Sequence, residues 1–275
     1  MIKDILAIVD DGDHAQTFLK TVAELAAARE ATLEVAALTP APTASPGTAP
    51  FGTLYVPEWV LMGDDQANVE RVRAHLAAAG SSAEIFGLHD DIGWLAGNLK
   101  RRRQVADLIA IGARETWANP WLRRRVAETL IRASGTPLLI LPEEQTLKPV
   151  RRAVLGWKAG PEATRAMHTL VQLADPGALI DVVTVGTSLH ACEGEQEAHA
   201  EVKRHLLRHG FDAQGHWVVN DDKSEAETLT LYAQEIGADL IAIGGFAHSR
   251  IREILLGGVT GDLLERTETP LVVVG

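Results

Sequence analysis

The sequence predicts an α/β fold made of two doubly wound parallel sheets of five strands each, and three observations lead to it. Residues 106–112 read Ala-Asp-Leu-Ile-Ala-Ile-Gly, and residues 238–244 repeat this phrase letter for letter, 132 residues later. A second echo follows, because Thr136-Pro137-Leu138 returns as Thr269-Pro270-Leu271, 133 residues on. Apolar runs of strand length also alternate with segments of helix length. The shared offset indicates an internal duplication with the period of a whole domain.

The first half is expected to alternate strands and helices. Runs such as Leu108–Ile111 and Leu271–Val274 are apolar throughout, which is typical of parallel strands covered by helices on both faces. In chain order, the expected elements are a strand at Ile2–Val9, a helix at Asp13–Arg29, a strand at Thr32–Leu38, a helix at Asp64–Ala79, a strand at Ala83–Leu88, a helix at Ile92–Arg103, a strand at Asp107–Gly112, a helix at Leu122–Ala133 and a strand at Pro137–Leu141.

The second half repeats this order. Residues 143–150 are polar and contain a proline, so we expect domains at 1–143 and 150–275. The second set of elements is a strand at Arg152–Trp157, a helix at Pro161–Ala174, a strand at Leu179–Val185, a helix at Gly194–His209, a strand at Ala213–Val219, a helix at Ser224–Ile236, a strand at Asp239–Gly244, a helix at Arg250–Arg266 and a strand at Pro270–Val274.

One segment of the first half has no counterpart of similar length in the second. Residues 40–62 form a long proline-rich loop, whereas residues 186–193 bridge the same gap in the second half. A loop this long is unusual unless it has a function or is disordered. It either packs on its own domain, covers a ligand site, or docks a protein partner through its apolar part at 51–62.

Composition excludes several classes of protein. The net charge of −11 argues against nucleic acid as a partner, and a single cysteine, Cys192, excludes an intramolecular disulfide. The first apolar run, Ile5–Val9, is too short for a signal peptide or a membrane span. We therefore expect a cytoplasmic protein with no membrane partner.

The segment after the strand at 239–244 carries the strongest candidate site. Ligands of doubly wound sheets bind beyond the carboxyl ends of the strands, where the strand order reverses. Gly257 and Gly258 could let backbone N–H groups approach an anion there, with the Thr260 hydroxyl as a further donor. The same glycines would also suit a tight turn and close helix packing.

These residues resemble the motif of ATP-binding universal stress proteins, G-x2-G-x9-G-[S/T] after the fourth strand. Gly244 and Gly257 fall on its first and third glycines, Ala247 replaces the second, and Gly258 replaces the Ser or Thr. The resemblance covers nearly the whole chain. It implies two domains of the adenine nucleotide alpha hydrolase-like fold, a role in stress response, and ATP or another adenine nucleotide as the ligand. Further ligand contacts are expected at Phe246, Val259 and Thr260.

The two halves differ in what they keep of this site. ATP-binding relatives usually place an aspartate at the end of the first strand, where the second half has Trp157 and Lys158. Lys158 would favour an anionic ligand, and Trp157 would either stack on a ring or pack against the following helix. The first half keeps Asp10 but has Arg124-Arg125 where the second has Gly257-Gly258. We therefore expect the small-molecule ligand to bind in the second domain.

The resemblance also implies how the chain assembles. Its last strands, Pro137–Leu141 and Pro270–Val274, resemble the edge along which two such domains pair. A duplicated chain often reproduces an ancestral homodimer, so we expect the domains to be related by pseudo-two-fold symmetry. The chain would then be an internal pseudo-dimer, either monomeric or homodimeric in solution.

No residue pattern indicates catalysis. The chain has no Walker sequence, and no pair of carboxylates is spaced for magnesium in the motif. His205 and His209 are four residues apart, a spacing able to chelate metal but also common on exposed helices, so no metal site is expected. We expect a non-enzymatic module that binds a small molecule or nucleotide; the alternative is an ATP-binding protein with slow ATP hydrolysis. A flavoprotein of the same architecture remains open on fold alone.

Overall fold

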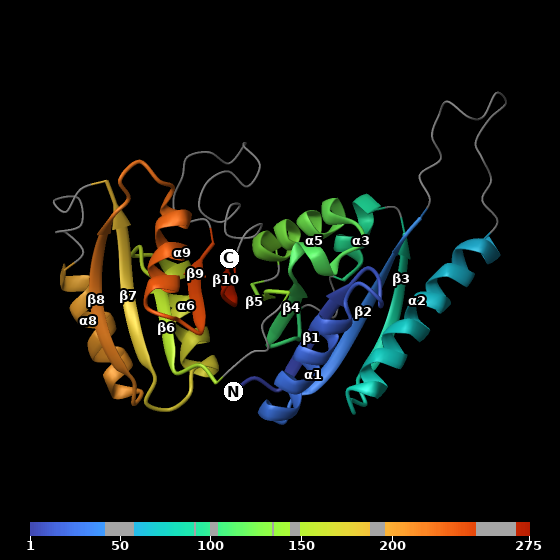
Figure 1. Ribbon diagram of the computed structural model, residues 1–275, viewed down its shortest axis with the longest axis horizontal. Coiled ribbons are helices and arrows are strands. Elements are labelled where there is room, and N and C mark those ends of the chain that lie inside the picture. The colour runs from blue at the N-terminus through green and yellow to red at the C-terminus, as the bar shows by residue number, and fades with distance from the viewer. Residues whose placement is uncertain are drawn as a thin grey trace. The chain divides into compact units, whose positions relative to one another are not determined.

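A computed structural model describes residues 1–41, 58–90, 92–99, 104–133, 135–143, 149–187, 196–245 and 268–275. The chain divides into two compact units, residues 2–130 and residues 131–275 (Figure 1). Each unit has the α/β architecture expected from the sequence, but the first holds four strands and the second six, because the last strand of the first half, β5, pairs with β10 in the second unit. Each unit is described by itself.

The unit of residues 2–130 is a parallel sheet with the strand order β3-β2-β1-β4. The chain moves from β1 outward to β2 and β3, and returns to β4 on the other side of β1. Its elements are β1 (Asp4–Val9), α1 (Gln16–Arg29), β2 (Thr32–Pro40), α2 (Glu58–Ala78), β3 (Glu84–Asp90), α3 (Ile92–Asn98), β4 (Leu108–Gly112), a short 3-10 turn (Arg114–Thr116) and α5 (Pro120–Ala133), which runs past the boundary.

The unit of residues 131–275 has the strand order β5-β10-β9-β6-β7-β8. All neighbours from β10 to β8 are parallel, whereas β5 pairs with β10 in antiparallel fashion. Its elements are β5 (Leu138–Leu141), β6 (Arg152–Gly156), α6 (Pro161–Leu173), β7 (Leu179–Gly186), α8 (Gln196–Arg208), β8 (Asp212–Val219), α9 (Glu225–Glu235), β9 (Leu240–Gly244) and β10 (Leu271–Val274).

The element order agrees with the sequence throughout the described residues, and most boundaries agree within two residues. Two boundaries are wrong. α2 begins at Glu58, so residues 58–62, which the sequence assigned to the long loop, are helical, and the helix expected at Ile92–Arg103 ends at Asn98, with Leu99 in a turn and residues 100–103 outside the described residues. Residues 42–57 and the helix expected at Arg250–Arg266 lie outside the described residues. The central strands β4 and β10 are buried along their whole length, which explains why their sequences do not alternate.

The repeated phrase has a structural role that is the same in both halves. The carboxylate of Asp107 accepts hydrogen bonds from the backbone N–H groups of Lys3 (2.7 Å) and Asp4 (3.1 Å), at the start of β1. The carboxylate of Asp239 accepts the equivalent bonds from Arg151 and Arg152, both 3.0 Å, at the start of β6. Each aspartate thus ties the fourth strand of its half to the beginning of the first.

The last strands of the two halves pair, as the sequence predicted. Leu271 lies opposite Ile140, Val272 opposite Leu139, and Val273 opposite Leu138. Leu138 and Leu271 are the same position of the repeated Thr-Pro-Leu phrase. The local register is therefore symmetric about Leu139 and Val272, as expected for two copies of one strand meeting edge to edge.

Candidate functional site

The candidate site lies at the carboxyl ends of the central strands, at the point where the strand order reverses. This point falls between β1 and β4 in the first half and between β6 and β9 in the second. Ile5 pairs with Leu108, and Ala153 pairs with Leu240, which is the same position of the repeated phrase. Counting forward from these pairs, Lys158 occupies the place of Asp10, and Ala159 the place of Asp11.

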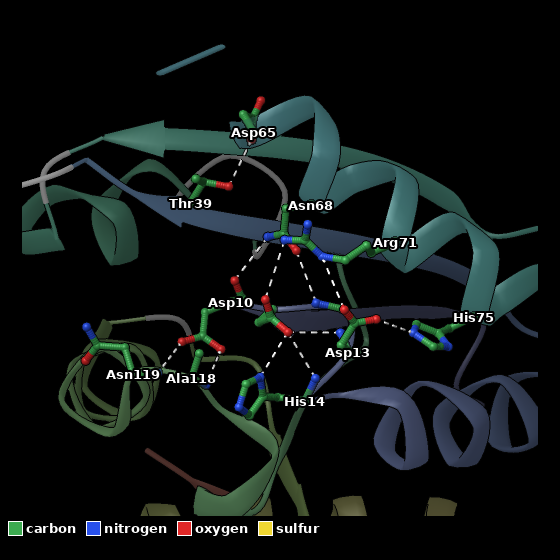
Figure 2. A network of polar contacts seen from close by, with 12 residues as sticks. Asp10, Asp13, His14, Thr39, Asp65, Asn68, Arg71, His75, Ala118 and Asn119 are labelled. Carbon is green, nitrogen blue, oxygen red and sulfur yellow. Dashed lines mark hydrogen bonds and ion pairs between the residues drawn. The ribbon is translucent and has the colours of Figure 1, made fainter. Parts of the chain in front are cut away.

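Asp10 closes this edge in the first half (Figure 2). Its side chain is only 6% exposed, and its two carboxylate oxygens accept hydrogen bonds from the backbone N–H groups of Ala118 (3.0 Å) and Asn119 (2.7 Å). These donors stand just before α5, whose partial positive charge favours an anion. An anionic group of the chain itself therefore occupies the natural anion position.

The ionisation of Asp10 is set by two opposing effects. Burial is the larger and raises its pKa to about 6, and the nearby Asp11 carboxylate also raises it, whereas the hydrogen bonds from Asn119 and Ala118 lower it. The carboxylate is therefore mostly ionised at neutral pH and becomes protonated in mild acid.

Further acidic groups surround Asp10. Asp11 accepts hydrogen bonds from the backbone N–H groups of Asp13 and His14, both 3.0 Å, and the same carboxylate oxygen lies 3.0 Å from Nδ1 of His14, whose pKa its hydrogen bond raises. Asp13 pairs with His75 of α2 at 2.9 Å. Asn68, also of α2, donates to the carbonyl of Asp10 and accepts from the N–H of Gly12. Arg71 of α2 lies 3.5 Å from Asp11 and 3.8 Å from Asp13, so α2 contacts this edge through Asn68, Arg71 and His75.

The second half has the opposite charge at the same edge. Lys158 is exposed, and Ala159 brings no carboxylate. Gly160 is the N-cap of α6 and offers no side-chain acceptor to the first helical turn. The nearest acidic side chain described there, Glu162, pairs with Arg165 at 3.3 Å.

The structure brings together three of the residues expected to bind a ligand. Trp157 and Gly244 each lie one position beyond the paired Gly156 and Ile243, and Lys158 follows directly. A Cβ on Gly244 would lie 2.7 Å from the backbone nitrogen of Ala163, so only glycine lets β9 end against the start of α6. The Trp157 indole is 8% exposed, so it packs within the fold and leaves little face free for a ligand ring.

The other expected contacts remain predictions. Phe246, Ala247, Gly257, Gly258, Val259 and Thr260 lie outside the described residues. In the first half, Arg123, Arg124 and Arg125 occupy the corresponding part of the sequence, and all three make contacts within the fold. Arg123 is 2% exposed and donates from Nε to the carbonyl of Gly112 (2.9 Å), whereas Arg124 and Arg125 pair with Glu128 at 3.0 Å and 3.7 Å.

Sequence reasoning overlooked two polar residues behind this edge, Thr184 and His199. The Thr184 hydroxyl lies 2.8 Å from both the carbonyl of Trp157 and Nε2 of His199. The sequence feature that could have indicated this contact is Thr184 itself, a polar residue inside the otherwise apolar end of β7. Three other histidines lie close together: the ring centroid of His205 is 5.5 Å from that of His168 and 4.5 Å from that of His209. Across the described ranges, however, no three His, Cys, Asp or Glu side chains are arranged to hold a metal ion.

Comparison with known proteins identifies the family. The model of the universal stress protein family matches the chain twice, at residues 1–142 and at residues 149–275. The chain belongs to the universal stress protein family. It carries two universal stress protein domains in tandem, in agreement with the internal repeat. No helix in the described part of this universal stress protein is long and apolar enough to cross a membrane.

Individual relatives agree with this assignment. A universal stress protein of Synechocystis sp. is 25% identical over 217 residues, which cover 74% of this chain and 72% of the relative. The crystal structure of a universal stress protein from Archaeoglobus fulgidus matches with a TM-score of 0.72 at 14% identity, covering 98% of this chain and 96% of that one. A putative universal stress protein from Pseudomonas aeruginosa matches with a TM-score of 0.61 at 15% identity, over 99% and 93%. The structural matches show the fold.

Proposed function

We propose that this universal stress protein is a non-enzymatic module of stress tolerance that binds an adenine nucleotide, such as ATP, in its second half alone. The observation that carries the proposal is the reversal of charge at one structural position, from Asp10 in the first half to Lys158 in the second.

The first half is unsuited to a phosphate group for two reasons. Asp10 stands where ATP-binding relatives usually place an aspartate, but both of its carboxylate oxygens already accept hydrogen bonds from the N–H groups of Ala118 and Asn119, so neither the carboxylate nor these donors are available to a ligand. Asp11 and Asp13 add two carboxylates to the same edge and share one guanidinium, that of Arg71, at 3.5 Å and 3.8 Å, so with Asp10 the edge has three carboxylates against one arginine, which disfavours a phosphate. A ligand would therefore have to displace Asp10 and bear this repulsion.

The second half offers the complementary arrangement. Lys158 is exposed at the equivalent position, and α6, whose N-cap Gly160 has no side-chain acceptor, begins three residues later at Pro161. A hydrogen bond between a cation and a phosphate contributes about 1.5–3 kcal/mol, or about ten- to a hundred-fold in affinity. The glycines expected at 257 and 258 would supply backbone donors.

Slow ATP hydrolysis is not favoured over binding alone. The described part of this edge supplies a cation and backbone donors, whereas the one carboxylate described beside it, on Glu162, is paired with Arg165. Magnesium-assisted phosphoryl transfer normally uses carboxylates that hold the metal. We therefore propose that the bound nucleotide acts as a ligand.

Calorimetric titration of ATP tests the proposal. The wild type should bind one ATP per chain, and Lys158→Met, which removes the charge and keeps a long side chain, should weaken binding at least about tenfold. Lys20→Met is the matched control, because Lys20 is an exposed lysine on α1 in the other half, and it should bind like the wild type. Absence of ATP binding to the wild type, or full binding by the Lys158→Met variant, would refute the proposal.

A further inference from the structure

A chain of buried polar contacts leads from α8 to the backbone of the proposed ligand site. His199 of α8 is 2% exposed, and its ring stacks on Trp217 of β8, with 4.6 Å between ring centroids and an interplanar angle of 18°. Its Nε2 lies 2.8 Å from the Thr184 hydroxyl of β7. The same hydroxyl donates to the carbonyl of Trp157, also at 2.8 Å.

The direction of these hydrogen bonds follows from the groups involved. A carbonyl oxygen can only accept, so the single proton of the Thr184 hydroxyl points to Trp157. The Thr184 oxygen must then accept from His199, which requires the proton of the imidazole to be on Nε2. Burial lowers the pKa of His199, and so do the nearby His216 and Lys203, so the ring is neutral with this one tautomer.

The contact acts on the peptide that carries Lys158. The N–H of Trp157 donates to the carbonyl of Val183 (2.8 Å), as in a regular ladder between β6 and β7. The next acceptor along the chain, the Trp157 carbonyl, accepts a hydrogen bond from the Thr184 hydroxyl instead of from a backbone N–H group. This carbonyl and the N–H of Lys158 belong to one planar peptide unit, so a bond that holds the carbonyl also holds the N–H. The direction in which Lys158 leaves the sheet is thereby set.

The protein leaves room for this arrangement on the neighbouring strand. A Cβ on Gly215 of β8 would lie 2.8 Å from Nδ1 of His199, so a larger residue there would push the imidazole away from Thr184. Trp217 packs against the ring face and limits its rotation. His199 therefore has a fixed ring position as well as a fixed tautomer.

We propose that His199 and Thr184 are positioning residues of the nucleotide site: they orient the Trp157–Lys158 peptide so that Lys158 is presented to the anionic ligand. This inference rests on the proposed function for its ligand, but the positioning itself can be measured without any ligand. Neither residue touches the nucleotide. Both act through the backbone that precedes Lys158.

A pair of variants at Thr184 separates the hydroxyl from the shape of the side chain. Thr184→Val keeps the branched shape and removes the hydroxyl, whereas Thr184→Ser keeps the hydroxyl. In ligand-free protein, the NMR shifts of the Trp157 carbonyl carbon and the Lys158 amide nitrogen, the two ends of this peptide unit, should change in Thr184→Val and stay close to wild type in Thr184→Ser. ATP affinity should fall at least about fivefold in Thr184→Val and stay within about twofold of wild type in Thr184→Ser.

Nitrogen NMR of the wild-type imidazoles provides a check that needs no variant, because it should show His199 protonated at Nε2 alone. A proton on Nδ1, or unchanged shifts of the Trp157 carbonyl carbon and the Lys158 amide nitrogen in a folded Thr184→Val protein, would overturn the positioning role. If ATP does not bind the wild type while these shifts respond as expected, the proposed function fails and the positioning role stands. If ATP binds and both variants match the wild type in affinity and in these shifts, the proposed function stands and the positioning role fails.

Discussion

The carboxyl group of Asp10 should make the free energy of unfolding depend on pH, and the variant Asp10→Asn should lack this contribution. Burial raises the pKa of Asp10 to about 6 from its ordinary 3.8. An acid whose pKa is higher in the folded state binds its proton more tightly when folded, so folding is favoured by protonation. Stability from this group is therefore present at low pH and is lost as pH rises through about 6.

The size of the effect follows from the shift. At about 1.4 kcal/mol for each pH unit, a rise from 3.8 to about 6 corresponds to about 3 kcal/mol between about pH 4 and about pH 7. Asp10→Asn also loses a carboxylate oxygen that accepts from Ala118 or Asn119, but this cost does not vary with pH. The difference in unfolding free energy between wild type and variant should therefore fall by about 3 kcal/mol over this range.

Urea unfolding of both proteins at a series of pH values measures this difference directly. Contributions from the other titrating groups cancel, because both proteins contain them. A carbon NMR titration of the Asp10 carboxyl group gives its pKa independently. A difference that stays constant or rises with pH would show that the two backbone hydrogen bonds outweigh burial, and the reasoning would be refuted.

Three further predictions concern the repeated phrase and the glycine motif. Gly244→Ala should destabilise the protein by about 1–3 kcal/mol in urea unfolding, because its methyl group would overlap the backbone of α6. Asp107→Ala and Asp239→Ala should each cost about 1–3 kcal/mol in the same assay, because one carboxylate oxygen of each aspartate accepts from two backbone donors; a loss in one half only would contradict the equivalence of the two contacts. Ala247→Gly combined with Gly258→Ser should strengthen ATP binding at least about tenfold by calorimetry, and no gain in a folded variant would show that these positions do not set affinity.

The two halves share one fold but differ in the charged residue at the carboxyl ends of their central strands. Both have the same strand order at the switch point and the same aspartate tie at the start of the first strand. They differ at the position just beyond the first strand of each half, which is Asp10 after β1 and Lys158 after β6. Asp10 turns back onto the N–H groups before α5, whereas Lys158 remains exposed. This change of charge at one position is the basis of the proposal that the second half, and not the first, receives an anion.

The order of strands and helices followed from the sequence alone because it depends on local patterns. A run such as Leu108–Ile111 is too short for a buried helix and is apolar throughout, which favours a strand buried on both faces, and the repeated phrases place its equivalent in the second half. The start of α2 was misjudged because residues 58–62 follow a proline-rich stretch that resembles loop in composition. The glycine motif likewise pointed to the second half through its spacing.

Only the tertiary structure decided what the polar residues around the edge do. Asp10 and Asn119, like Trp157 and Thr184, are far apart in the chain and meet only when parallel strands align their carboxyl ends. The sequence could show that Arg123 is charged, but its burial against the carbonyl of Gly112 depends on the packing of α5. Periodicity reports which face of an element is apolar, whereas the partner of a hydrogen-bonding group depends on which elements the fold brings together.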